Sequence, residues 1–230
     1  MMSEETPIRA CVLVFDRMDL VDFVAPLETL NHAYKKDTTT FETLISTVVA
    51  APTEEVMTKQ GVAIKRQISW EQAAASLADY DVLVAPGSFL VETMAVCNDP
   101  DSPFIKMLRD FSKLPASTSK SGQRILLSIC SGSFFLAAAG LLDGRRTTTH
   151  YTMISQLEEL AAKYGKTDIS RHIFVDSGVL DSGVRMISSG GLTSGFDATL
   201  YTVELVCGEE CAEFAADVLE HPCRKSQALF

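Results

Sequence analysis

The chain has 230 residues, of which 47% are hydrophobic and 22% charged, and its 20 Lys and Arg against 30 Asp and Glu give a formal net charge of −10. These values exclude disordered and fibrous proteins and predict one globular domain, residues 1–230, with a substantial core. An acidic chain without a dense Lys or Arg tract is a poor electrostatic match for nucleic acid or an anionic membrane, so we expect neither as a partner.

Targeting and membrane-spanning patterns are missing from the sequence. Residues 1–6 are acidic and lack an apolar h-region, and no apolar run reaches the roughly 18 residues that a bilayer requires. We therefore expect a soluble, cytoplasmic protein with reduced cysteines. Cys207 and Cys211 are spaced as on one face of a C-terminal helix, but no recognised metal-ligand spacing surrounds them. We expect them to be packing residues, and we expect no metal or other cofactor.

Strand-like apolar segments alternate with helical ones along the chain. Pro26 is expected to stand at the start of the first helix, where its missing N–H costs nothing. The predicted strands are 8–15, 41–50, 81–85, 124–129 and 184–188, and the predicted helices are 26–34, 136–139, 150–164 and 197–206. This order indicates the α/β class, with a mostly parallel sheet that is covered by helices on both faces.

In such sheets, ligands bind beyond the carboxyl ends of the strands. One of these ends carries the most specific local pattern, in which the strand 124–129 runs directly into Cys130, followed by Ser131 and Gly132. This is the layout of a nucleophile elbow with Cys in place of Ser. Backbone N–H groups at a helix N-terminus would stabilise a thiolate and a developing substrate anion. The alternative is a buried structural cysteine.

The chain resembles the ThiJ/PfpI superfamily, whose members are relatives of class I glutamine amidotransferases. The resemblance is carried by I-C-S-G-S-F-F-L-A-A-A-G-L-L-D-G-R-R-T-T-T-H (129–150), S-G-G-L-T-S-G-F-D (189–197), V-D-F-V-A-P-L-E-T-L (21–30) and A-P-G-S (85–88). It implies a flavodoxin-like sandwich in a single domain and a homodimer. Protease-like members have His directly after the nucleophile, whereas this chain has Ser131, which argues against a protease. The Asp-x-x-Ala-Pro pattern, the hydroxyl residue after Cys and the Thr-Thr-His segment are most similar to the isonitrile hydratase branch.

The same resemblance implies an acid that faces Cys130. Many members have Glu at this place, and the matching residue here is Asp22. Asp22 could instead cap the following helix, and Asp19 is a competing carboxylate. Glu28 is more typical of a first-turn helix acid than of a catalytic one.

Four further residues are implied as substrate or oxyanion contacts: Gly87, Ser88, Ser131 and His150. Gly87 and Ser88 follow a strand, where they could equally form a simple turn, and Ser88 replaces the second Gly that many relatives have. His150 could activate the thiol as a Cys/His pair or only bridge a loop and a helix.

The resemblance implies an enzyme that acts on a small molecule, with hydration of an isocyanide to an N-substituted formamide as the leading hypothesis. Cys130 would attack the terminal carbon to give a thioimidate, and Asp22 would move the protons. A second hypothesis is glyoxalase or deglycase chemistry on 2-oxoaldehydes. A third is a non-catalytic redox sensor in which Cys130 is oxidised.

Overall fold

A seven-stranded sheet forms the centre of the molecule in the computed structural model, which describes residues 7–35 and 43–230. The strand order is β10-β11-β7-β6-β1-β2-β5, and all neighbours are parallel except β10 and β11. These strands are β1 (Ile8–Leu13), β2 (Ile45–Ala51), β5 (Ile68–Ser69), β6 (Val82–Ala85), β7 (Arg124–Ser128), β10 (Phe174–Val179) and β11 (Val184–Ser189). Every residue of β6 and β7 is buried, as expected for central strands covered on both faces.

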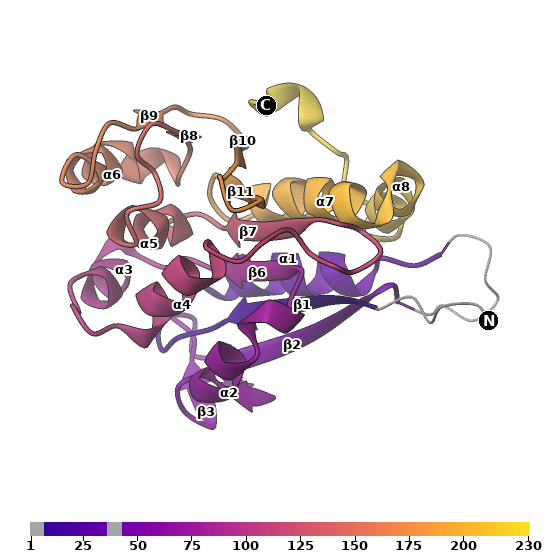
Figure 1. Ribbon diagram of the computed structural model, residues 1–230, viewed down its shortest axis with the longest axis horizontal. Coiled ribbons are helices and arrows are strands. Elements are labelled where there is room, and N and C mark those ends of the chain that lie inside the picture. The colour runs from indigo at the N-terminus through magenta and orange to yellow at the C-terminus, as the bar shows by residue number, and fades with distance from the viewer. Residues whose placement is uncertain (1–6, 36–42) are drawn as a thin grey trace.

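Helices cover both faces of this sheet, with α1 packed beside α7 on one face and α2 to α5 on the other (Figure 1). The longer helices are α1 (Leu20–Asn31), α3 (Leu90–Cys97), α4 (Pro103–Phe111), α6 (Ile154–Ala161), α7 (Ser194–Cys207) and α8 (Glu209–Val218). The shorter ones are α2 (Trp70–Ala75) and α5 (Gly132–Ala138), with 3-10 turns η1 (Leu77–Asp79), η2 (Tyr151–Met153) and η3 (Lys225–Gln227). Two small pairs complete the fold: β3 (Glu55–Met57) with β4 (Ala63–Lys65), and β8 (Arg146–Thr147) with β9 (Asp168–Ile169).

The expected α/β fold with a mostly parallel sheet is confirmed, but several boundaries differ. The first helix begins at Leu20 rather than at Pro26, because Asp19 caps it by accepting a hydrogen bond from the Val21 N–H. Pro26 therefore lies inside α1, where it cannot donate to the carbonyl of Asp22 four residues earlier. The strand expected at 41–50 is β2, while its residues 41 and 42 lie outside the described part of the chain.

Two expectations about helices are also corrected. The segment expected as one helix at 150–164 is the turn η2 followed by α6. Cys207 and Cys211 do not share a single helix, because the chain breaks at Gly208, whose φ of 97° suits glycine. In the described part of the chain, no helix has the length and apolar character needed to cross a membrane.

The sheet positions the site through the order of its strands. β1 lies between β2 and β6 in the sheet, so the chain adds strands first on the β2 side of β1 and later on the β6 side. A change of direction of this kind opens a crevice at the carboxyl ends of the strands.

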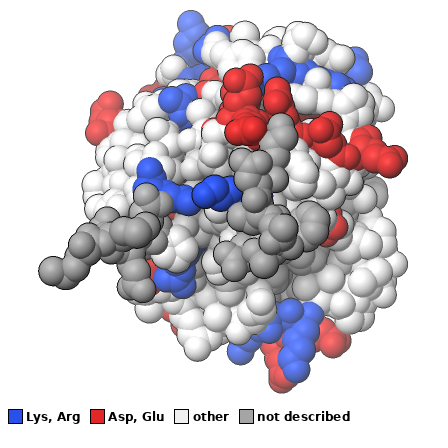
Figure 2. Space-filling model, turned by 90° about the vertical axis from the view of Figure 1, so that its right-hand side faces the viewer, with Lys and Arg blue, Asp and Glu red and all other residues white. Residues whose placement is uncertain are grey.

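Figure 2 shows one face of the molecule, on which acidic side chains gather in one area and Lys and Arg lie in separate groups.

Candidate active site

Cys130 occupies the sharp turn between β7 and α5. Its φ of 57° lies in the left-handed region, which a side chain other than glycine adopts only when its surroundings hold it there. Three hydrogen bonds do so: its N–H donates to the Gly190 carbonyl at 3.2 Å, and its carbonyl accepts from the hydroxyls of Thr149 at 3.0 Å and Ser133 at 3.3 Å. The strained elbow that the sequence predicts is therefore present.

Gly132 allows this turn to pack against the neighbouring strand. A Cβ atom added to Gly132 would lie 2.2 Å from the carbonyl oxygen of Ala85, and this backbone atom cannot move aside as a flexible side chain can. Similarly, a Cβ at Gly87 would lie 2.7 Å from the Ser131 nitrogen and 2.8 Å from the Gly132 nitrogen. The absence of side chains at these two positions lets the β6 and β7 ends approach closely.

Asp22 projects from the first turn of α1 and is completely buried. Burial, followed by the charge of Asp19, raises the pKa of its carboxyl to about 7, although interactions with the Cys130 thiol and with the backbone of Leu192 and Gly87 lower it. These contacts fall short of full hydrogen bonds, because neither carboxyl oxygen has a well-formed partner among the described residues. A buried carboxyl with unsatisfied oxygens is costly to keep charged, so near neutral pH it can both take up and release a proton.

The thiol of Cys130 is the partner of this carboxyl. Burial and the neighbouring charge of Asp22 raise its pKa well above the ordinary value, while the backbone of Ser131 and Leu192 lowers it. The expectation that the elbow N–H groups stabilise a thiolate is therefore wrong for this arrangement, because they do not offset burial and the nearby charge of Asp22. The resting pair keeps its proton on sulfur, and Asp22 is the group that can receive it.

The three candidate acids have different environments in the structure. Asp19 is the helix cap, and its second carboxyl oxygen accepts a hydrogen bond from the Gln60 amide at 2.7 Å. Glu28 is half exposed and lies 3.7 Å from His32, so it belongs to the surface. Asp22 is the carboxyl that interacts with Cys130, as the resemblance implies. The catalytic roles of Cys130 and Asp22 stay predictions, but the two groups are together.

Ser131 and Ser88 are linked to each other rather than free. The Ser131 hydroxyl accepts from the Ser88 N–H at 2.8 Å, and it shares a hydrogen bond with the Thr93 hydroxyl at 2.8 Å. The Ser88 hydroxyl donates to the Arg17 carbonyl at 2.5 Å. These contacts tie the turn after β6 to the elbow and to the start of α3, so both serine side chains position the backbone. The Ser131 backbone, which interacts with the Cys130 sulfur, remains the candidate oxyanion contact.

Leu192 is a residue of the candidate site that sequence reasoning missed. Its φ of 52° is again left-handed, and its backbone interacts with both Cys130 and Asp22. Because the contribution is made by the main chain, the leucine side chain gives no chemical signal. The only hint is the preceding Gly190 and Gly191, which belong to a loop already singled out in the sequence.

His150 stands at the edge of the site. Its Nδ1 atom lies 2.8 Å from the Thr152 hydroxyl, and no hydrogen bond joins it to Cys130 among the described residues. The ring packs against Gly191, where a Cβ would lie 2.1 Å from its Cδ2 atom. Burial lowers its pKa, although Asp19 opposes this, so the imidazole is predominantly neutral at neutral pH. The geometry favours His150 as a wall of the site over an activating base in contact with sulfur.

A cavity of about 180 Å³ gives access to Cys130, a residue that is only 5% exposed. Its lining residues are Asp19, Ser88, Phe89, Cys130, His150, Thr152, Met153 and Leu192. The cavity is small compared with the roughly 300–1,000 Å³ of sites for drug-sized ligands. No cluster of three or more His, Cys, Asp or Glu suited to a metal ion occurs in residues 7–35 and 43–230. The reactive groups that this cavity brings together are the thiol of Cys130 and the neighbouring carboxyl of Asp22.

The fold and this site define an α/β protein with a cysteine elbow facing a buried acid. The DJ-1/PfpI family matches residues 8–204, and the chain belongs to that family. The resemblance to the ThiJ/PfpI superfamily is thereby confirmed.

The chain is similar in sequence to two named proteins. Isonitrile hydratase of Pseudomonas putida is 32% identical over 116 residues, which are 50% of this chain and 46% of that protein. Protein DJ-1alpha of Drosophila melanogaster is 29% identical over 166 residues, or 72% of this chain and 66% of that protein. The chain thus aligns with about half to two thirds of the length of these relatives.

Solved structures show the same fold. A ThiJ/PfpI family protein from Pseudomonas syringae has a TM-score of 0.71 at 23% identity, with 95% of this chain and 78% of that chain covered. DJ-1 of Schizosaccharomyces pombe has a TM-score of 0.70 at 19% identity, with 94% and 100% covered. The flavodoxin-like architecture expected from the sequence is confirmed.

Proposed function

We propose that this protein is a cysteine-dependent hydratase that converts a small isocyanide, R–N≡C, to the N-substituted formamide, with Cys130 as nucleophile and Asp22 as proton carrier. The observation that carries the proposal is the buried Cys130–Asp22 pair, in which the carboxyl pKa is raised to about 7. An isocyanide carbon must gain a nucleophile and a proton, and this pair supplies both.

In the first step, the Cys130 sulfur forms a bond to the terminal carbon as its proton passes to the Asp22 carboxylate. Asp22 then delivers that proton to the same carbon, which gives the thioimidate Cys130–S–CH=N–R. The net change is that the terminal carbon gains both the sulfur and the proton of the thiol, so charge and protons balance. This order suits a resting thiol, because the proton leaves sulfur only as the S–C bond forms.

In the second step, water adds to the thioimidate carbon. Asp22 removes a proton from the water and passes it to the nitrogen, which gives a tetrahedral S–CH(OH)–NH–R intermediate and restores the Asp22 carboxylate. The C–S bond then breaks, the hydroxyl proton returns through Asp22 to sulfur, and the formamide leaves. The backbone of Ser131 and Leu192, which already interacts with the sulfur, is placed to stabilise charge as it develops.

The cavity favours an apolar substrate over a hydrated aldehyde. Phe89, Met153 and Leu192 contribute apolar walls beside Cys130, and the volume of about 180 Å³ admits only a small substituent R. The named relative with this activity, isonitrile hydratase, is 32% identical over half of the chain and gives independent support.

The proposal is tested by incubating the protein with cyclohexyl isocyanide and measuring N-cyclohexylformamide by chromatography. We expect turnover by the wild type and its loss in Cys130→Ala and in Asp22→Asn. A parallel assay measures lactate from methylglyoxal, which would reveal the glyoxalase alternative. Formamide formation at the wild-type rate by either variant, or lactate as the only product, would contradict the proposal.

A further inference from the structure

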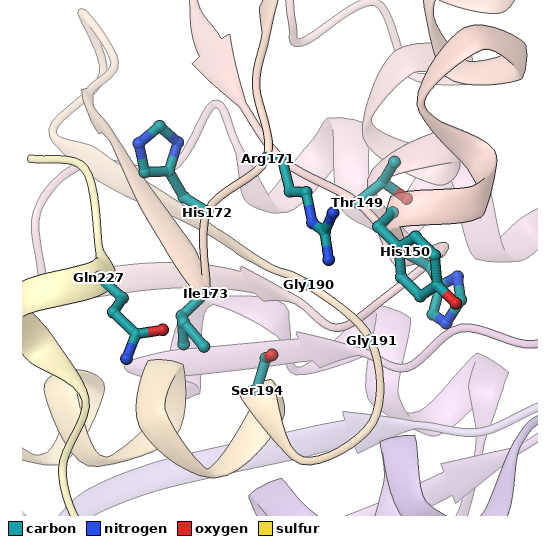
Figure 3. Close-up of a pocket in the computed structure, with 10 residues that line it drawn as sticks. Thr149, His150, Arg171, His172, Ile173, Gly190, Gly191, Ser194 and Gln227 are labelled. Atoms are coloured by element: carbon teal, nitrogen blue, oxygen red, sulfur yellow. The ribbon is translucent and has the colours of Figure 1, made fainter.

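A second cavity of about 310 Å³ adjoins the cavity of Cys130, and the proposed chemical steps use none of its side chains. We call it the Arg171 cavity, and its lining residues are Thr149, His150, Tyr151, Arg171, His172, Ile173, Gly190, Gly191, Ser194 and Gln227 (Figure 3). His150 lines both cavities, and the backbone at 190–191 leads directly to Leu192 in the first one. The two spaces are therefore separated by one imidazole ring and one short loop.

The charge of the Arg171 cavity has a single sign, since its lining includes Arg171 but no Asp or Glu. The guanidinium lies 4.9 Å from the centre of the Tyr151 ring, which orients it without neutralising it. Within the described part of the chain, no carboxylate forms an ion pair with Arg171. Figure 3 shows the guanidinium extending into the open space above Gly190.

Two neutral hydrogen-bonding groups face the same space. Ser194 is 9% exposed, at the start of α7, and Gln227 comes from the C-terminal segment (Figure 3). The backbone of each is held in place, because the Ser194 N–H donates to the Gly191 carbonyl at 3.2 Å and the Gln227 carbonyl accepts from Ile173 at 3.2 Å. Their side chains, by contrast, form no hydrogen bond within residues 7–35 and 43–230.

We propose that the Arg171 cavity binds a small carboxylate, with Arg171 as the charged donor and Ser194 and Gln227 as neutral donors. A planar guanidinium and a carboxylate form paired, charge-assisted hydrogen bonds, and the cavity contains no acidic group to oppose them. The carboxylate is either the tail of the molecule that reacts at Cys130 or a separate small acid. This site does not depend on the proposed hydratase reaction.

Binding is measured first, without any reaction. The probes are N-formylglycine and its neutral methyl ester, titrated into the wild-type protein by calorimetry and by backbone amide NMR. We expect the acid to bind at least about tenfold more tightly than the ester and to shift the amides of Gly190, Gly191 and Ser194. Equal binding of acid and ester, or shifts confined to other parts of the chain, would overturn the proposal.

Matched variants assign the binding to the cavity. Arg171→Gln should weaken binding of the acid about tenfold and leave that of the ester unchanged, and Ser194→Ala should weaken it a few-fold. Lys163→Gln removes the same charge from an exposed residue outside the cavity lining and should change nothing. If Arg171→Gln and Lys163→Gln weaken binding of the acid equally, only the net charge of the protein matters, and the proposed site is wrong.

A kinetic experiment separates the two sources of the carboxylate. If the substrate supplies it, isocyanoacetate should have a higher kcat/KM than methyl isocyanoacetate in the wild type, and Arg171→Gln should abolish that preference. If a separate acid supplies it, the two isocyanides should react alike, while N-formylglycine still binds and changes the rate with the ester. Failure of all turnover would contradict the hydratase but leave the binding result to decide on the site.

Discussion

The carboxyl of Asp22 and the thiol of Cys130 interact, and each makes the charged form of the other less favourable. The carboxyl comes from the first turn of α1 and the thiol from the elbow after β7, so the meeting of β-strand ends brings together residues more than 100 positions apart. Since the pair is buried, it resists carrying two negative charges at once.

Replacing Asp22 by Asn should make Cys130 more reactive toward a simple alkylating agent. The negative charge of Asp22 raises the thiol pKa, so its removal should lower that pKa and increase the thiolate fraction. We expect iodoacetamide to modify Cys130 several-fold faster in Asp22→Asn than in the wild type at about pH 8. The site of modification is measured by peptide mass spectrometry, with exposed Cys223 as internal control. A slower reaction at Cys130 would show that Asp22 activates the resting thiol.

The same carboxyl should make the protein less stable as the pH rises. Its pKa is about 7 in the folded protein against an ordinary value of 3.8, so the folded state binds the proton more strongly. The favourable contribution is complete below the ordinary pKa of 3.8 and is lost progressively until the pH reaches about 7, by an amount on the order of a few kcal/mol. Denaturant unfolding of wild type and Asp22→Asn between about pH 5 and 8 measures it. We expect Asp22→Asn to remove this decline in the free energy of unfolding. If the two proteins lose stability in parallel as the pH rises, the decline does not come from Asp22.

Much of this site follows from local sequence rules, and the rest depends on backbone conformation. The apolar strand that leads into Cys130 predicts the elbow, because strand, nucleophile and small residues are adjacent in the chain. The Asp-x-x-Ala-Pro resemblance identifies Asp22, yet its burial depends on a helix that begins at Leu20. That start could not be derived from Pro26, since a proline inside a helix can be tolerated when an earlier residue, here Asp19, provides the cap.

Two parts of the site could not be derived from residue type. Leu192 acts through its main chain in a left-handed conformation, and a leucine side chain does not indicate such a conformation. Ser131 stays a predicted oxyanion contact through its backbone, but its hydroxyl bonds to Ser88 and Thr93, which its residue type does not indicate. That outcome depends on how closely Gly87 lets the two turns approach, which is a tertiary property.

Ser131→Ala should therefore affect stability. Loss of the hydroxyl leaves the buried N–H of Ser88 and the hydroxyl of Thr93 without this partner, at an expected cost of about 1–3 kcal/mol in the free energy of unfolding. Ser155→Ala, at an exposed position on α6, is the control and should change it by less than about 0.5 kcal/mol. Equal stability of the two variants in urea unfolding would refute the positioning role of Ser131.

Gly191 and His150 should be coupled in their effects on stability. A methyl group at Gly191 would lie 2.1 Å from the His150 ring, so Gly191→Ala should displace the ring and cost about 1–3 kcal/mol. In a His150→Ala background the obstacle is gone, and the same substitution should cost much less. The four proteins form a double-mutant cycle measured by denaturant unfolding. Additive costs would mean that the ring and the glycine do not restrain each other.

The most direct test of covalent catalysis is the mass of the protein during turnover. We predict that wild type rapidly mixed with cyclohexyl isocyanide and quenched in acid gains the mass of one isocyanide on the peptide that contains Cys130. The gain should disappear as N-cyclohexylformamide accumulates and should never form in Cys130→Ala. Formamide production by the wild type without any adduct on Cys130, or an equal adduct and turnover in Cys130→Ala, would contradict the role assigned to this thiol.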